Sequence, residues 1–364
     1  MVAATPVWIV VVIVVAAGVG ALGFYAGYAY HPPPSSSPKA VENSTLSVLG
    51  AGTLTVTFPE IASELVNETP GISAPAAAQD YEGSLDVATA ITSLGATADV
   101  AALADFRLAP QLLDPKYADY EVVFAQTQEV LIYNASLPAF HGVNASNWGA
   151  DLVTDVTTSG NAPFGVWNAS TDPNGYNEIF TLMLQGELYG SGLTDYYSHL
   201  YHGAPGAYAN PSPTTTVNEH ESQAASLVET GVVSAVITYK AVAIQNGLPY
   251  VPIDPIVGLL ANNTTALADY ATLSTEIISS TGSLTPVYPA PILFTATVPR
   301  NAPNPALGAA FLHLLLSPQG SAILAQGGAW IPVFPGWTDS PSAVPSVLAP
   351  DVTTLPGWAS AFLG

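Results

Sequence analysis

The sequence contains no cysteine, which excludes disulfide bonds, thiolate metal sites and lipid attachment through a cysteine. It is also poor in cations, with 5 Lys and Arg against 27 Asp and Glu among 364 residues. Because binding to phosphate backbones requires clustered cations, we expect no nucleic-acid partner. Charged residues make up only 9% of the chain, which we interpret as a sign of an exported protein that faces acid.

Signatures of catalysis are missing as well. No serine lies in a nucleophile elbow with an ordered His and Asp, and no glycine-rich segment matches a P-loop. His199 and His202, together with Glu219 and Glu221, supply residue types that bind divalent cations, but their spacing provides no coherent fourth ligand. We therefore predict a protein without enzymatic activity, resident metal or cofactor.

The N-terminus carries a long apolar segment. Trp8 to Tyr30 has no charged residue and reaches the length of about 20 residues that a membrane-spanning helix needs. The preceding residues lack the Lys or Arg of a signal peptide. We predict a membrane anchor over residues 1–30, with a cleaved signal sequence as the alternative, and a stiff Pro/Ser linker over residues 31–44. The remainder would lie at the extracellular face of the cell membrane, either anchored or secreted.

Asparagine sequons agree with an extracellular location. Seven potential acceptors for N-glycans occur, some of which are expected by chance in a chain this rich in Thr and Ala. They are Asn43, Asn67, Asn134, Asn144, Asn168, Asn262 and Asn263.

The body of the chain is large enough for two lobes, because 49% of the sequence is hydrophobic. Short β-prone segments alternate with helix-length segments, which predicts an α/β protein with mainly parallel sheets. The segment 121–133 is strongly β-prone and is expected to cross from one lobe to the other. Further expected strands are 46–54, 100–104, 233–239 and 292–298; expected helices are 58–66, 176–189, 222–230, 305–316 and 318–326.

Seven short motifs occur in a characteristic order between Ser47 and Pro335. They are Gly50–Leu54, Glu82–Leu85, Ala98–Asp105, Tyr117–Tyr120, Asp172–Tyr176, Val236–Tyr239 and Val298–Asn304. In the order and spacing of these motifs the chain resembles the archaeal branch of molybdate/tungstate-binding proteins, which have the type II periplasmic-binding-protein fold.

The resemblance implies a two-lobed clamp that closes on a ligand in the cleft between its lobes. Residues 45–126 and 251–364 would form the first lobe and residues 127–250 the second. The expected ligand is a tetrahedral oxyanion, molybdate or tungstate, and the expected partner is the membrane permease of an ABC transporter. We expect the protein to act as a monomer.

The resemblance also indicates which residues hold the anion. Hydroxyls and backbone N–H groups in loops that open onto helix N-termini bind anions without Lys or Arg. Thr53 stands where the family has a serine, and Ser84 matches the serine of the second loop. Ser222 would offer its amide at the start of a helix, and Tyr239 its phenol.

Asp172 and Tyr176 belong to a motif whose Asp ligates the metal of the bound oxyanion in the family. A glutamate that also ligates it there is Thr238 here, and Asn174 and Asn177 replace a cysteine and an arginine of the family pattern. Coordination therefore remains either partial or purely by hydrogen bonds, with a protonated Asp172 as a donor. Sulfate, phosphate-like and arsenate-like anions stay open as ligands.

Simpler interpretations stand beside these. The Gly50–Thr53 segment is also a plain strand-to-helix turn, Asp172–Gly175 is a strong β-turn sequence, and Tyr239 suits a half-buried strand. A glycosylated surface protein that kept the fold and lost its ligand is the rival function.

Overall fold

The computed structural model describes residues 44–157, 162–190, 215–218, 220–260, 264–278 and 283–363. The predicted anchor and nearly all of the linker lie outside these residues, as do Asn43, His199, His202 and the two sequons Asn262 and Asn263. Among the described residues no single helix is long and apolar enough to cross a membrane. Two consecutive helices, α9 (Pro305–Leu315) and α10 (Pro318–Leu324), reach that length and composition only together, with a bend of 71° between them.

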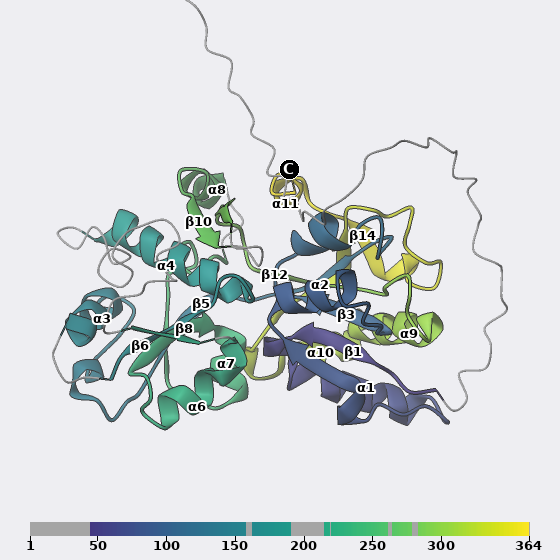
Figure 1. Ribbon diagram of the computed structural model, residues 1–364, viewed down its shortest axis with the longest axis horizontal. Helices are drawn as coiled ribbons and strands as arrows, with labels where there is room; N and C mark the ends of the chain where they lie inside the picture. Colours follow the sequence, from purple (N-terminus) through teal and green to yellow (C-terminus); the bar gives the residue numbers. More distant parts are fainter. Residues whose placement is uncertain are drawn as a thin grey trace, which may run out of the picture.

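A seven-stranded mixed sheet forms the core of the first lobe, drawn on the right of Figure 1. The Val100–Leu103 strand is buried at every residue and apolar throughout, as a strand covered on both faces usually is. In spatial order the strands are β14 (Val352–Thr354), β13 (Ile331–Thr338), β4 (Val122–Gln126), β12 (Leu293–Thr297), β3 (Val100–Leu103), β1 (Val48–Ala51) and β2 (Gln79–Glu82).

The helices of this lobe bury apolar faces against that sheet. Phe58, Ile61 and Leu65 recur at helical spacing on α1, and Phe58 meets Phe311 of α9 edge to face with ring centroids 5.1 Å apart. The lobe contains α1 (Thr57–Glu68), α2 (Ser84–Thr92), the π-helical turn η3 (Ala109–Leu113), α9 (Pro305–Leu315), α10 (Pro318–Leu324) and α11 (Gly357–Ser360).

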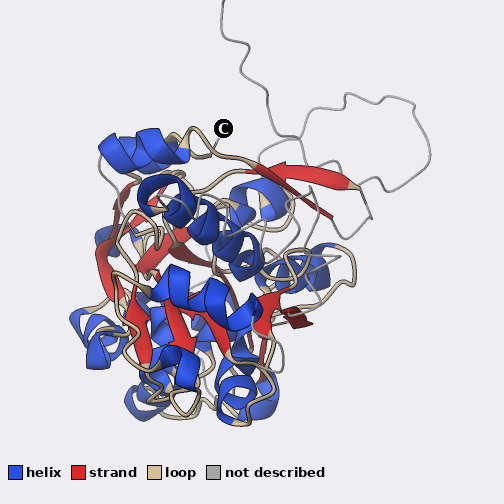
Figure 2. Cartoon of the chain, turned by 90° about the vertical axis from the view of Figure 1, so that its left-hand side faces the viewer, coloured by secondary structure: helices blue, strands red, loops and turns tan. Residues whose placement is uncertain are grey.

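A five-stranded sheet forms the core of the second lobe, on the left of Figure 1 and toward the viewer in Figure 2. Its strands in order are β7 (Thr215–Asn218), β6 (Phe164–Trp167), β8 (Ala235–Tyr239), β5 (Glu129–Tyr133) and β9 (Tyr250–Pro252). Its helices are α3 (Trp148–Thr157), α4 (Pro173–Tyr189), α6 (Ala224–Glu229) and α7 (Lys240–Gln245); α8 (Thr264–Tyr270) and the hairpin β10 (Thr275–Ile278) to β11 (Leu284–Val287) follow.

The mixed α/β class predicted from the sequence is confirmed. β4 belongs to the first sheet and β5, which begins at Glu129, to the second, so the chain passes between lobes at 127–128. The first sheet then resumes with β12, and the predicted boundary at 250/251 falls within β9.

The expectation of mainly parallel sheets is wrong. Among the strands that the structure describes, β4 pairs antiparallel with β12 and β13, β3 pairs antiparallel with β12, and β5 pairs antiparallel with β8 and β9. The physical reason is that β4, β5 and β12 lie next to the two lobe crossings, where strands entering and leaving a lobe run in opposite directions. The alternation of strands and helices does not reveal this reversal.

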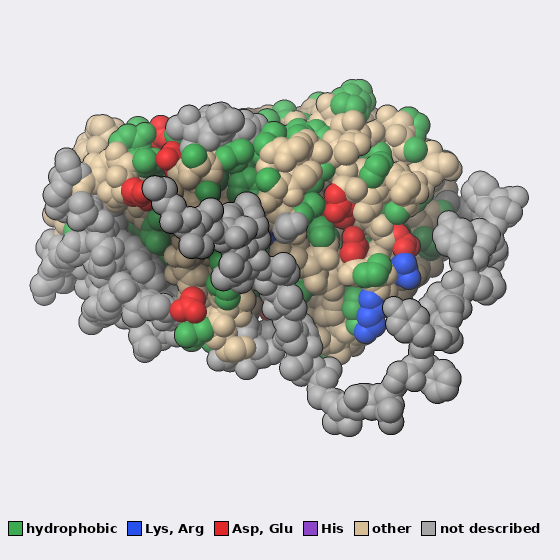
Figure 3. Space-filling view, turned by 90° about the horizontal axis from the view of Figure 1, so that it is seen from above, with side chains coloured by type: hydrophobic (Ala, Val, Ile, Leu, Met, Phe, Trp, Pro, Cys, Tyr) green, Lys and Arg blue, Asp and Glu red, His purple; other side chains and the backbone are tan. Residues whose placement is uncertain are grey.

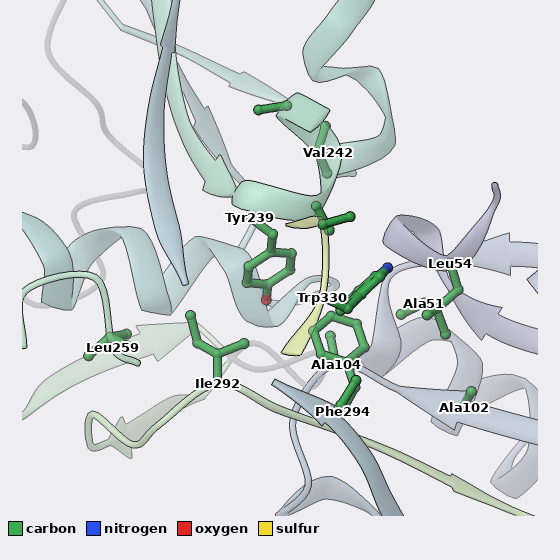
Figure 4. Packing of buried hydrophobic residues seen from close by; sticks show 14 of the residues in the cluster. Ala51, Leu54, Ala102, Ala104, Tyr239, Val242, Leu259, Ile292, Phe294 and Trp330 are labelled. Carbon is green, nitrogen blue, oxygen red and sulfur yellow. The ribbon is translucent and has the colours of Figure 1, made fainter. Parts of the chain in front are cut away.

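Aromatic side chains join the two lobes. Tyr239 of β8 meets Phe294 of β12 edge to face at 5.5 Å, and Phe294 stacks likewise against Trp330 at 4.7 Å, as Figure 4 shows. The side-chain amide of Gln245 on α7 satisfies its neighbours best with its oxygen accepting from Oγ1 of Thr57 on α1 at 2.7 Å. On the face seen in Figure 3, charged side chains form only scattered spots between polar and apolar ones. Tyr239 and Phe294 belong to different sheets, so the described lobes are in direct contact.

Candidate functional site

Thr53 of the first lobe meets Glu221 of the second where the lobes touch. Thr53 lies in the short 3-10 turn η1 (Gly52–Leu54) that follows β1, and Glu221 opens the turn η6 (Glu221–Gln223). The backbone N–H and Oγ1 of Thr53 both donate to Oε1 of Glu221, at 2.7 and 2.5 Å. Thr53 is 2% exposed and Glu221 1%. The predicted donor residue of the first lobe therefore already donates to a carboxyl oxygen of this chain.

Asp172 caps the N-terminus of α4 in the second lobe. Its Oδ1 accepts from the backbone N–H of Asn174 at 2.9 Å, and Pro173 follows in the first helical turn, where its missing N–H costs nothing. These two features start α4 at Pro173, three residues before the predicted start at Tyr176. Oδ2 accepts from the backbone N–H of Glu221 at 3.1 Å. A continuous chain of contacts thus runs from Thr53 through Glu221 to Asp172.

Ser84 lies close to the same junction, in the first turn of α2. The preceding residue, Gly83, packs so tightly that a Cβ atom on it would lie 2.2 Å from the carbonyl oxygen of Thr171 in the second lobe. The N–H of Leu85 donates to that oxygen at 3.1 Å. Ser84 is buried, and its Oγ accepts from the N–H of Ala104 at 2.8 Å, which leaves its own proton for a donated bond.

Tyr176 bridges the lobes from α4. Its hydroxyl donates to Oδ2 of Asp105 at 2.7 Å, and Asp105 forms a 2.6 Å ion pair with Arg107. Burial opposes ionisation of Asp105, but the charge and hydrogen bonds of Arg107 outweigh it and lower the pKa of that carboxyl. Sequence reasoning missed Asp105 and Arg107; the available signal was an acidic residue directly after a buried strand, beside one of very few cations.

Tyr239 and Thr238 end β8 with fully buried side chains. The Tyr239 hydroxyl accepts from Nδ2 of Asn177 at 3.2 Å. Oγ1 of Thr238 lies 3.1 Å from the side-chain amide of Asn174. Thr238 thus contacts Asn174, and its side chain has no hydrogen bond to Asp172 among the described contacts.

Two further buried carboxyls, also missed from the sequence, surround this region. Glu129 begins β5 and Glu178 lies in α4, both with no exposed surface. The Asn174 amide satisfies its neighbours best with its nitrogen facing Glu129 Oε1 at 2.7 Å and its oxygen facing Thr238 Oγ1 at 3.1 Å. Burial, followed by the charges of Glu178 and Glu221, raises the pKa of Glu129 well above its usual range.

The electrostatics of the junction favour the neutral form of Asp172 and of two phenols. Burial and then the adjacent Glu221 raise the pKa of Asp172 well above its usual range. Burial and then the charge of Asp172 raise the pKa of the Tyr239 phenol in the same way, and burial with Asp105 raises that of Tyr176. Both phenols therefore stay protonated and able to donate hydrogen bonds.

The predicted site residues are distributed unequally around this junction. Thr53 and Asp172 are both hydrogen-bonded to Glu221. Tyr239 lies close enough to Asp172 and Glu221 for their charges to raise the pKa of its phenol. Ser222 is exposed and lies beside Gly52: a Cβ on the glycine would be 3.3 Å from the Cβ of Ser222. Ser222 is therefore at the solvent-facing edge of the junction. Glu221, which sequence analysis considered only for a metal cluster, is central; no group of three His, Asp or Glu able to hold a metal ion occurs among the described residues.

Comparisons with known proteins agree with this architecture. The chain is 28% identical over 298 residues to the molybdate/tungstate-binding protein WtpA of Pyrococcus abyssi, covering 78% of this chain and 84% of that one. It is 28% identical over 324 residues to an uncharacterized solute-binding protein of Methanoculleus marisnigri, covering 85% and 88% of the two chains.

Solved structures share the fold at low sequence identity. The periplasmic molybdate-binding protein of Azotobacter vinelandii superposes with a TM-score of 0.54 at 17% identity, covering 79% of this chain and 98% of that one. The sulfate-binding protein SubI of Mycobacterium tuberculosis gives 0.51 at 12% identity, covering 85% and 90%. The family profile described as bacterial extracellular solute-binding protein matches residues 46–329, most of the chain. The protein therefore belongs to the bacterial extracellular solute-binding protein family.

Proposed function

We propose that this solute-binding protein captures a tetrahedral oxyanion, molybdate or tungstate, and delivers it to the permease of an ABC transporter. The observation that carries the proposal is the pair of Thr53 donors, which already hold a carboxylate oxygen at 2.7 and 2.5 Å at the junction of the lobes. Hydrogen bonds from amides and hydroxyls to an ionised acceptor are short and strong. The name of the Pyrococcus abyssi relative supports the choice of anion.

Binding a dianion in a cation-poor site depends on neutral donors and on protonated carboxyls. Thr53, Ser84 and Tyr239 offer hydroxyl protons, and Ser222 offers an amide at the rim. A raised pKa keeps Asp172 neutral over a wider pH range, which removes one repulsive charge. Asp172 would then either donate to an oxyanion oxygen or, once ionised, ligate the metal directly. Tyr176 would act by holding the second lobe against Asp105 of the first.

Capture would proceed by hinge closure. The junction residues are almost inaccessible in the closed contact, so the ligand must enter while the lobes are apart. The ligand then favours closure by the difference in its affinity for the two states, and the closed form is the one the permease recognises. An anchor over residues 1–30, a monomeric state and glycans on the sequons remain predictions of this proposal.

A thermal-shift titration of the protein tests the proposed ligand. At about 100 times Kd, a ligand that binds only the folded state adds about 2.7 kcal/mol, so for a chain of this size we expect the midpoint to rise by roughly 3 to 5 °C. Molybdate and tungstate should give the largest shifts, with sulfate and phosphate smaller and chloride of equal ionic strength giving none. A flat response to all four oxyanions would support the surface-protein function, and a largest shift with sulfate or phosphate would reassign the ligand.

Replacing Asp172 by Asn tests direct ligation of the metal. Asn keeps the helix cap and the shape of the side chain but cannot supply a carboxylate ligand. If Asp172 ligates the metal, molybdate affinity measured by calorimetry should fall at least about tenfold, a loss of about 1.4 kcal/mol. Asp80→Asn, at an exposed position of β2, is the matched control and should bind as the unchanged protein does. Unchanged affinity in Asp172→Asn would leave a hydrogen-bonded anion as the mode of binding.

A further inference from the structure

Arg107 is a cation at the junction of the lobes that the proposed function does not yet explain. It is one of only five Lys and Arg residues in the chain, and its side chain is 12% exposed. A guanidinium that is largely withdrawn from water loses hydration, and this loss must be compensated by partners in the protein. The partners of Arg107 therefore indicate what the residue does there.

The guanidinium of Arg107 binds Asp105 through both carboxylate oxygens. Nε donates to Oδ1 at 2.9 Å and Nη2 to Oδ2 at 2.6 Å, and the backbone N–H of Arg107 also donates to Oδ1 at 2.9 Å. Paired bonds of this kind fix the orientation of a carboxylate as well as strengthening the contact. Nη1 donates to the carbonyl oxygen of Tyr288 at 2.9 Å, in the segment that leads from β11 to β12 of the first sheet. Arg107 thus holds Asp105 in one orientation and ties it to that segment.

Asp105 lies beside residues of the candidate site in both lobes. Its Oδ2 accepts from the hydroxyl of Tyr176 in the second lobe at 2.7 Å. Tyr176 follows Asp172 by four residues at the start of α4, so both lie on one side of that helix. Ala104, the residue before Asp105, donates its N–H to Oγ of Ser84 at 2.8 Å. Asp105 is therefore close to the region where the proposed function places the dianion.

A carboxylate at this position has two opposing effects on anion capture. As an ionised acceptor, Asp105 forms a short, strong hydrogen bond with Tyr176, which holds the lobes together. Its negative charge would also repel a dianion nearby, because charges at a buried boundary are weakly screened by water and salt. Arg107 cancels the repulsion and keeps the hydrogen bond, since the ion pair has no net charge and Oδ2 still accepts from Tyr176.

We infer that Arg107 is a positioning residue for oxyanion capture: it fixes Asp105 as the acceptor for Tyr176 and cancels the charge of Asp105, so that the lobes close on a dianion without repulsion. Arg107 acts through Asp105 and not by contact with the ligand. The inference rests on the proposed function and adds to it the counter-charge that lets a cation-poor cleft contain an ionised carboxylate.

Charge compensation tests the inference, with molybdate affinity measured by calorimetry. Arg107→Gln leaves Asp105 without its counter-charge, and we expect the Kd to rise at least about tenfold. Adding Asp105→Asn removes the unpaired charge, so the double variant should bind at least about threefold more tightly than Arg107→Gln alone. A side chain that served only packing would not be rescued in this way, because the second substitution removes further contacts. Arg107→Lys keeps the charge and should lose less affinity than Arg107→Gln.

Arg300→Gln is the matched control. Arg300 pairs with Asp119 on the first lobe, where the two side chains are 50% and 51% exposed, so its loss should change the Kd less than about twofold. Circular dichroism checks that each variant folds. If Arg107→Gln does not fold, the double variant and Arg107→Lys carry the test, and each should bind within about tenfold of the unchanged protein.

The possible failures are distinguishable. Equal affinity of Arg107→Gln and the unchanged protein, or no gain in the double variant, would overturn the inference and leave the proposed function standing. An Arg107→Lys variant as weak as Arg107→Gln would likewise overturn it, because the charge would then not be what matters. If the unchanged protein binds none of molybdate, tungstate, sulfate and phosphate, the proposed function is refuted and the inference falls with it.

Discussion

Gly83→Ala is expected to prevent closure of the two lobes and to lower oxyanion affinity by at least about 100-fold, a loss of about 2.8 kcal/mol. A Cβ on Gly83 would lie 2.2 Å from the carbonyl oxygen of Thr171, more than about 1 Å inside van der Waals contact. The backbone of Gly83 has φ −63° and ψ 142°, which alanine adopts without strain. The clash is therefore confined to the contact between lobes, and each lobe should still fold.

Two measurements separate loss of closure from loss of folding. Small-angle scattering should show a larger radius of gyration for Gly83→Ala at saturating molybdate, while circular dichroism should show an unchanged secondary structure. Gly357→Ala is the control, because a Cβ on this exposed glycine of α11 meets nothing within 4 Å. If Gly83→Ala bound molybdate like the unchanged protein, the closed contact would not be the binding state.

The predictable part of the fold depended on local patterns. The apolar spacing of α1 and the continuous apolar run of β3 are properties of adjacent residues, so both elements could be placed from the sequence. The direction of β12 between β3 and β4 could not be predicted from the sequence, because it depends on where the chain re-enters this sheet after the second lobe. The β-prone segment 121–133 contains two strands, β4 and β5, because it is too long for one strand of usual length.

The site was less accessible to sequence reasoning. Thr53 and Asp172 were found through family motifs, yet the residue that joins them was not, because Glu221 lies 168 positions from Thr53 and in no motif. Arg107 was overlooked although cations are rare, since its role depends on Asp105 and Tyr176 meeting across the lobes. Contacts between the lobes join residues that are far apart in the sequence, and the spacing of apolar residues along the chain does not predict such contacts.

The stability of the protein is expected to fall as pH rises from about 4.5 to about 9. At one end of the first sheet, burial raises the pKa of Glu121 to about 9, with Asp339 and Asp114 adding repulsion, and burial with Asp339 raises that of Asp114 to about 6. A carboxyl whose pKa is raised in the folded state keeps its proton at pH values where the unfolded chain has released it. Its contribution to stability is complete below the pKa of the unfolded chain and is lost as the pH rises through the pKa of the folded state. Glu129 and Asp172 shift in the same direction.

The size of the effect follows from Glu121. One pKa unit corresponds to about 1.4 kcal/mol, so even half of its displacement predicts a loss of about 3 kcal/mol between the two limits. Urea unfolding at pH 5, 7 and 9 measures it directly. Glu121→Gln should flatten the profile, because an amide cannot ionise, whereas Glu68→Gln at an exposed position of α1 should leave it unchanged. Below pH 4 the pH dependence of stability reverses, because Arg107 lowers the pKa of Asp105 and protonation of that carboxyl then destabilises the fold. We therefore expect maximum stability near pH 4 to 5. Stability that rose steadily from pH 5 to pH 9 would mean that these buried carboxyls are ionised in the folded protein.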